Sequence, residues 1–72
     1  MKPFNVGIIG CGNISDRYFE ACRRFDILNL TACADKVRSR AREKAAQHNV
    51  PRDCTVKQLL STRSIDLVIN LT

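Results

Sequence analysis

The sequence predicts an α/β protein whose parallel sheet is one part of a doubly wound fold. Short apolar runs, typical of buried parallel strands, alternate with segments whose apolar residues recur at helical spacing. Glycines follow the first run, and an aspartate closes the second. Such alternation implies right-handed crossovers and a sheet covered on both faces. We therefore expect the order β-α-β-α-β-α-β and, by analogy with doubly wound sheets, the strand order 3-2-1-4.

The first half of the chain is predicted to hold two strands and a helix. Residues 4–9 are apolar on both faces, and Pro3 suits a strand start. From Gly12 onward the period changes to that of a helix, with an acidic residue in the first turn and basic residues in the last. The apolar residues that recur at helical spacing are Ile14, Tyr18, Cys22 and Phe25. Residues 28–34 are rich in small and β-favouring types and predict the second strand.

The second half is predicted to hold two more helices and two more strands. Residues 37–48 form a helix that ends at Asn49, shortly before Pro51. Cys54 falls in a very short third strand, and Thr55 is placed to cap the helical turn "VKQLLST". Residues 65–71, "IDLVINL", form the last buried strand.

Composition and length limit the classes of protein. The chain has 72 residues, which indicates one domain or part of one, and its longest apolar run is far short of a membrane span. The net charge of +5 is compatible with binding to nucleic acid. The cations of residues 36–44, however, do not form one basic stripe, because they lie on both sides of a helix face made by Val37, Ala41, Ala45 and His48. We therefore expect a cytoplasmic protein that binds neither nucleic acid nor membrane.

The four cysteines are predicted to be free, buried thiols, because no pair has metal or redox spacing. We predict no metal site. Cys11 is the exception to examine, since it lies between two glycines near a helix N-terminus that could lower its thiol pKa.

The stretch from Gly10 to Ser15, "GCGNIS", fits the pattern G-x-G-x-x-G/A with serine in the third slot. Gly10 permits a tight turn out of the strand, and Gly12 lets a pyrophosphate approach the backbone. Backbone N–H groups near Asn13 and Ile14 would face the phosphates from the helix N-terminus. Gly7 lies inside the strand, and we interpret it as a packing glycine.

Asp35 closes the second strand, 23 residues after Gly12. A carboxylate at that place can accept hydrogen bonds from the ribose hydroxyls of a dinucleotide. Asp35 could instead cap the helix that begins near Val37, and both roles can coexist. Its charge favours NAD, but the cations at Lys36, Arg38 and Arg40 leave NADP open, because a cation there can bind a 2′-phosphate.

These motifs and their order resemble the N-terminus of the glucose-fructose oxidoreductase / inositol dehydrogenase / MocA family over essentially the whole chain. The segments that carry the resemblance are "VGIIGCGNIS", "LTACAD" before an Arg/Ala-rich helix, and "TVKQLLSTRSIDLVINLT". The resemblance implies an NAD(P)-dependent oxidoreductase that acts on sugars, inositols or related polyols. It also implies an N-terminal Rossmann domain and a C-terminal α/β domain that carries most substrate contacts and oligomer interfaces.

Carried onto this chain, the resemblance implies a cofactor-binding set at the carboxyl ends of the strands. Leu71 and Thr72 fall where the family lines the nicotinamide side of the cofactor, although Thr72 fits an ordinary strand end equally well. The full predicted set is Gly10, Cys11, Gly12, Asn13, Ile14, Asp35, Lys36, Leu71 and Thr72.

The family's Glu-Lys-Pro motif, with its catalytic lysine, comes after the last strand predicted here, so no catalytic residue is assigned. We therefore expect residues 1–72 to be the N-terminal part of a dinucleotide-binding domain, inactive alone, in a parent that forms homo-oligomers through its other domain. The alternatives are a non-catalytic nucleotide-binding module or truncated product and, less favoured, a methyltransferase, which also has a glycine-rich turn.

Overall fold

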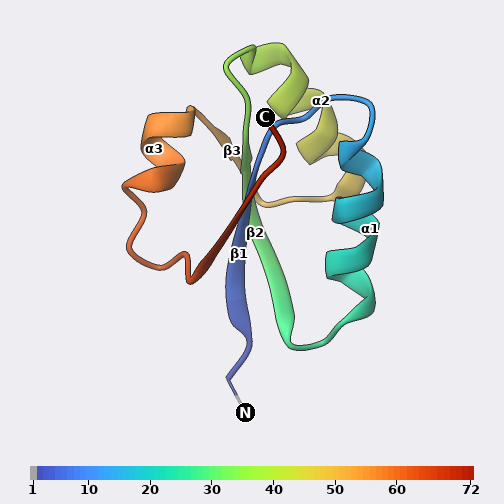
Figure 1. The fold of residues 1–72 in the computed structure, drawn as a ribbon, viewed down its shortest axis with the longest axis vertical. Helices are drawn as coiled ribbons and strands as arrows, with labels where there is room; N and C mark the ends of the chain where they lie inside the picture. The colour runs from blue at the N-terminus through green and yellow to red at the C-terminus, as the bar shows by residue number, and fades with distance from the viewer. Residues whose placement is uncertain (1) are drawn as a thin grey trace.

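The computed structural model describes residues 2–72, which form seven elements (Figure 1). The strands are β1 (Phe4–Ile9), β2 (Leu28–Ala34), β3 (Arg52–Cys54) and β4 (Leu67–Asn70). The helices are α1 (Ser15–Arg24), α2 (Arg38–His48) and α3 (Val56–Leu60). Each predicted element is present. Strands β1 and β2 have the predicted bounds, and the ends of the other elements differ from the predicted ones by at most three residues.

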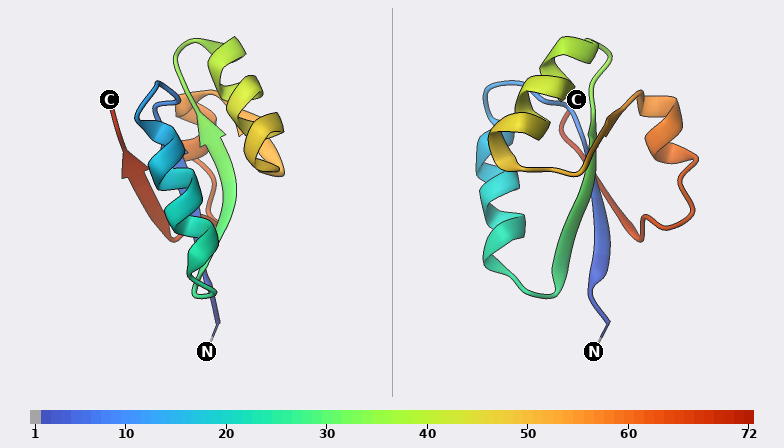
Figure 2. Two further views of the ribbon diagram at one scale, coloured as in Figure 1. Left: turned by 90° about the vertical axis from the view of Figure 1, so that its right-hand side faces the viewer. Right: turned by 180° about the vertical axis from the view of Figure 1, so that it is seen from behind.

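The four strands form one sheet in the order β3-β2-β1-β4, and all three strand pairs are parallel. Helices α1 and α2 lie on one side of the sheet and α3 lies on the other, as Figures 1 and 2 show. The predicted fold class and strand order are therefore confirmed. The end of β4 lies at the same edge of the sheet as the loop between β1 and α1, because parallel strands share their carboxyl edge.

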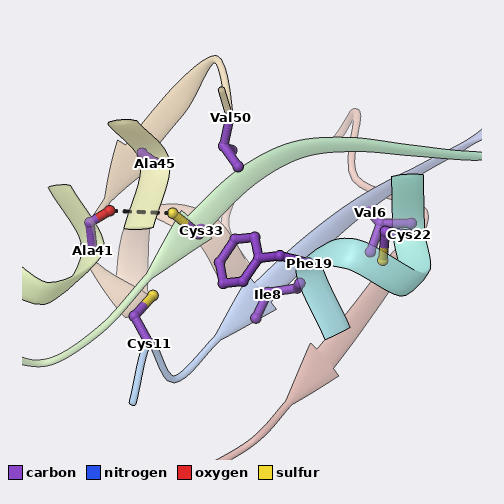
Figure 3. Packing of buried hydrophobic residues seen from close by; sticks show 9 residues of the cluster. All are labelled: Val6, Ile8, Cys11, Phe19, Cys22, Cys33, Ala41, Ala45 and Val50. Carbon is purple, nitrogen blue, oxygen red and sulfur yellow. Dashed lines mark hydrogen bonds between the residues drawn. The ribbon is translucent and has the colours of Figure 1, made fainter. Parts of the chain in front are cut away.

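Two layers of core flank the sheet. The larger cluster joins β1 and β2 to α1 and α2, and Figure 3 shows the ring of Phe19 within it. The smaller cluster joins the other face of the sheet to α3 through Leu59. Gly7 is buried in that second layer, where an added Cβ would lie 3.0 Å from Leu59 Cδ2 and 3.1 Å from Ile65 Cδ1, so it is a packing glycine.

The buried face of α1 differs from the apolar stripe noted in the sequence. Ser15, Phe19 and Cys22 are buried, whereas Tyr18 is 41% exposed. Ile14 and Phe25, at the two ends, are 62% and 56% exposed. Cys22 belongs to both the predicted stripe and the buried face, so two apolar stripes meet at Cys22, and the sheet covers the one that contains Phe19.

Three of the four residues predicted on the packed face of α2, Ala41, Ala45 and His48, are buried. The fourth, Val37, is 39% exposed, because it precedes the first helical turn as the N-cap in an extended conformation. The His48 ring stacks on Phe19 with centroids 4.7 Å apart. Asp16 of α1 accepts hydrogen bonds from Lys44 Nζ and, at the same oxygen, interacts with His48 Nε2, both at 2.8 Å. This polar cluster, which the sequence pattern did not suggest, joins the two helices on one side of the sheet.

The start of α3 is stabilised by local hydrogen bonds. Thr55 caps α3 as predicted, and it forms a capping box with Gln58.

All four cysteines are free thiols and all are buried. Within residues 2–72, no helix is long and apolar enough to cross a membrane.

Candidate cofactor-binding site

The carboxyl ends of β1, β2 and β4 surround a hollow of about 330 Å³, which we call the strand-end hollow. Most of the predicted cofactor-binding residues line it. Its lining consists of Gly10, Gly12, Ile14, Asp35, Lys36, Arg40, Leu71 and Thr72. Parallel topology explains this convergence, because each of the three strands ends at the same edge of the sheet.

A second hollow of about 290 Å³ lies beside the first and shares Gly12 and Arg40 with it. The two remaining predicted residues, Cys11 and Asn13, line this loop-side hollow together with Glu43 and Lys44. All nine predicted residues therefore line one or both of two adjacent hollows, and their contact with a cofactor stays a prediction.

Gly10 is required by the protein's own backbone. Its φ is +100°, a conformation that side chains disfavour, and an added Cβ would lie 3.2 Å from Leu71 Cβ and 3.3 Å from the Leu71 carbonyl carbon. Its N–H donates to Ala34 O at 2.8 Å, and Leu71 N donates to Ile9 O at 2.8 Å. Gly10 thus lets the chain turn between the ends of its two neighbouring strands.

Gly12 has the opposite environment. No atom lies within 4 Å of the place where its Cβ would be, and its φ is not in the left-handed region. Packing and backbone conformation within residues 2–72 therefore do not explain a glycine here. Open space over the backbone is what a pyrophosphate that contacts the main chain requires.

Helix α1 begins directly after this loop, at Ser15. Ser15 is fully buried, and its Oγ donates to Gly12 O at 2.5 Å, so serine serves in the small third position by bonding back to the loop. The N-cap residue, Ile14, provides no side-chain hydrogen bond to the helix. First-turn N–H groups lack intrahelical acceptors, and anions bind well at such a terminus.

Asp35 is 7% exposed, and both of its carboxylate oxygens accept backbone hydrogen bonds. Oδ2 accepts from Cys11 N and Oδ1 accepts from Val37 N, each at 2.8 Å. Asp35 is not the N-cap of α2, because that residue is Val37, yet it binds the backbone just before the helix.

Burial raises the pKa of the Asp35 carboxyl, but the backbone hydrogen bonds from Cys11 and Val37 outweigh it. Arg40 and Lys36 lower the pKa further, so the net shift is downward and the carboxylate is ionised at neutral pH. Arg40 lines both hollows, although the predicted site did not include it. Its signal was present in the sequence as one of the cations that follow Asp35.

The Asn70 side chain shapes the end of β4. Its Oδ1 accepts from Thr72 N at 3.0 Å and from Thr72 Oγ1 at 2.6 Å. Thr72 is exposed, whereas Leu71 packs against the larger core cluster. These bonds turn the chain across Gly10 and bring Thr72 to the wall of the strand-end hollow.

The Cys11 thiol is turned into the core, where its Sγ lies 3.5 Å from Ala34 O (Figure 3). The neighbouring Cys33 side chain lowers the pKa of the Cys11 thiol, whereas burial and the charge of Asp35 raise it. The predicted lowering is therefore present, but its main cause is a neighbouring thiol and not the helix terminus. Cys11 is 2% exposed, and its backbone N–H, more than its thiol, serves the loop.

Comparison with protein families decides the identity of this domain. Residues 4–72 match the model of the GFO_IDH_MocA family, described as an oxidoreductase family with an NAD-binding Rossmann fold. The chain belongs to this family. The resemblance predicted from the sequence is thus confirmed, and the domain is an NAD(P)-binding Rossmann domain of the Gfo/Idh/MocA oxidoreductases.

Several solved structures share the fold closely. A protein from Desulfitobacterium hafniense DCB-2, provisionally described as an NADPH-dependent oxidoreductase, is 22% identical with a TM-score of 0.88 over 99% of this chain and 20% of that one. A protein from Sinorhizobium meliloti 1021, provisionally described as a myo-inositol dehydrogenase, is 23% identical with a TM-score of 0.87 over 96% of this chain and 21% of that one.

A 3-ketoreductase from Actinomadura kijaniata, solved with NADP and TDP-benzene, is 26% identical with a TM-score of 0.82 over 93% of this chain and 21% of that one. The chain therefore spans about a fifth of the length of these relatives. No curated protein matches it.

Proposed function

We propose that this chain binds the dinucleotide of a nicotinamide cofactor in the strand-end hollow, with the pyrophosphate over Gly12. The open space at Gly12 carries the proposal, because the fold itself does not require a glycine there. The uncapped start of α1 supplies N–H groups for the phosphates, and Asp35 supplies a carboxylate for the ribose. Leu71 and Thr72 line the same hollow, and we propose that they face the nicotinamide end of the cofactor.

We further propose that NAD is preferred over NADP. Two backbone hydrogen bonds fix the orientation of the Asp35 carboxylate. Its negative charge would therefore stay close to the 2′-phosphate of NADP and repel that phosphate. Lys36 and Arg40 line the same hollow and reduce this repulsion. The balance favours NAD because the carboxylate is held by the backbone, whereas the two cations sit on exposed, flexible side chains.

The parent enzyme is proposed to transfer hydride between the nicotinamide ring and a carbon of a sugar, an inositol or a related polyol. The bound cofactor supplies the hydride chemistry, and residues 1–72 bind and orient it. The acid–base group is proposed to come from the parent enzyme outside residues 1–72. The second domain is proposed to carry most substrate contacts and to form the interfaces of a homo-oligomer. The alternative is a nucleotide-binding module without catalysis.

A calorimetric titration of the chain with NAD and with NADP tests this proposal. We expect both to bind at one site, with NAD the tighter ligand. Clearly tighter binding of NADP would overturn the preference, and binding of neither would overturn the proposal itself. The chain alone is expected to reduce no NAD in the presence of sugars or inositols, so turnover by residues 1–72 would contradict the division of roles.

A further inference from the structure

We propose that Asp35 is a positioning residue that sets the glycine loop in its binding conformation before a cofactor arrives. This role is separate from, and additional to, accepting ribose hydroxyls. It rests on the proposed function, since the loop is taken to be the pyrophosphate site.

The hydrogen bond from Cys11 N to Asp35 Oδ2 carries the inference. It is 2.8 Å long, buried, and joins residues 24 apart in the chain. Cys11 lies between Gly10 and Gly12, so the bond fastens the middle of the loop to the end of β2. Gly10 N donates to Ala34 O at 2.8 Å, which adds a second attachment at the neighbouring residue of the same strand.

A loop with two glycines gains most from such attachment, because glycine loses more conformational freedom on ordering than other residues. A ligand binds more tightly when the loop has already lost this conformational entropy during folding, because less entropy is then lost on association. The Oδ1 atom of Asp35 meanwhile accepts from Val37 N, so one carboxylate orients both the glycine loop and the entrance to α2.

The same carboxylate can still bind a ribose. Each oxygen of an ionised carboxylate can accept two hydrogen bonds, and each oxygen here accepts one from the backbone. An asparagine at this position has a single acceptor oxygen, and its NH₂ group would face one of the two backbone N–H groups. The local bond to Val37 N, two residues away, is the easier one to keep, so Asp35→Asn should release Cys11 N.

The control substitution is Asp66→Asn at the opposite edge of the sheet. Asp66 Oδ2 accepts from Asn5 N at 2.8 Å, so it is also an aspartate that binds a backbone N–H of the N-terminal segment. It lines neither hollow. Any effect that the two variants share reflects general stability and not the loop.

The experiment measures the affinity of ADP and of 2′,3′-dideoxy-ADP for the full chain and both variants. If Asp35 positions the loop, Asp35→Asn weakens the dideoxy ligand about tenfold, the size expected for losing one charge-assisted hydrogen bond. The Cys11 amide of the ligand-free variant also exchanges its proton faster, and Asp66→Asn changes neither quantity. If Asp35 binds only ribose, Asp35→Asn weakens ADP alone and leaves the Cys11 amide unchanged, which overturns the proposal.

A measurement on the wild-type chain keeps the proposal testable if Asp35→Asn does not fold. The ¹⁵N shifts of the Cys11 and Val37 amides should titrate together, at a pH below the ordinary pKa of aspartate. Arg40 and Lys36 are the charged side chains near the carboxyl, and both favour its ionised form. Separate midpoints, or a Cys11 shift that does not move, would refute the role. If the wild-type chain binds neither nucleotide, the proposed function is wrong, while the amide measurements still decide whether Asp35 sets the loop.

Discussion

The two loop glycines offer a pair of alanine substitutions with opposite expected effects. At Gly10 the protein itself excludes a side chain, because φ is +100° and Leu71 and Thr72 pass within 3.3 Å of the Cβ position. At Gly12 no neighbouring atom lies within 4 Å of the Cβ position. Gly10→Ala should therefore damage the fold, whereas Gly12→Ala should damage ligand binding alone.

The expected size of the first effect follows from the backbone. A side chain at positive φ costs about 1–2 kcal/mol, and close contact with backbone atoms of the β4 end adds to that. The reduced freedom of the unfolded chain returns about 0.4–1 kcal/mol for any Gly→Ala change. The free energy of unfolding of Gly10→Ala should fall by about 1–2 kcal/mol, a large part of the stability of so small a domain.

Gly12→Ala has no such cost, so its free energy of unfolding should stay level or rise by a few tenths of a kcal/mol, up to about 1 kcal/mol. Its methyl group would occupy the space assigned to the pyrophosphate. We expect NAD affinity to fall at least tenfold, which corresponds to about 1.4 kcal/mol. Urea unfolding and calorimetric titration of the wild-type chain and both variants measure the two quantities.

One result would refute the reasoning directly. If Gly12→Ala binds NAD as tightly as the wild-type chain while folding normally, the open space at Gly12 does not receive the phosphates. Equal stability of Gly10→Ala and the wild-type chain would show that the turn at Gly10 relaxes, contrary to the packing of Leu71 against it.

Three further substitutions or conditions test the fold that holds the site. The Lys44 hydrogen bond holds the pKa of Asp16 below its ordinary value. The stabilisation that this ionised carboxylate provides is present at neutral pH and is lost as the pH falls through the folded pKa. Asp16→Asn should therefore make the free energy of unfolding depend less on pH in the acidic range. Thr55→Ala removes the capping box and should lower the free energy of unfolding by about 1 kcal/mol, and an unchanged urea midpoint would contradict this. Gly7→Ala should destabilise by about 1 kcal/mol, because its Cβ would press on Leu59, and a more stable variant would show that these side-chain tips move aside at no cost.

The sequence carried enough information to predict the topology. Strand β1 is apolar on both faces and ends in glycines, and this pattern determined both its burial and the turn that follows it. The cap at Thr55 could also be predicted, because the Thr55 hydroxyl directly precedes the residues of α3 in the chain. Such features depend on interactions between residues that are adjacent in the sequence, so they can be predicted without the tertiary structure.

The features that the sequence did not reveal depend on distant neighbours. Helix α1 carries two apolar stripes, and only contact with the sheet selects the one with Phe19 over the one with Tyr18. The hydrogen bond from Cys11 N to Asp35 spans 24 residues, and no spacing rule indicates it. Arg40 reaches the hollows only because the first turn of α2 lies beside the glycine loop.

The most direct measurement is an NMR titration of the ¹⁵N-labelled chain with NAD. We expect shift changes at the amides around the strand-end hollow, which are those of Gly10–Ile14, Asp35, Lys36, Leu71 and Thr72. A hollow of about 270 Å³ at the other end of β2, lined by Cys22, Leu28 and Asn49 among others, serves as the internal comparison. Changes confined to the hollow beside Cys22, Leu28 and Asn49, or no changes at saturating NAD, would contradict the assignment of the glycine loop as the cofactor site.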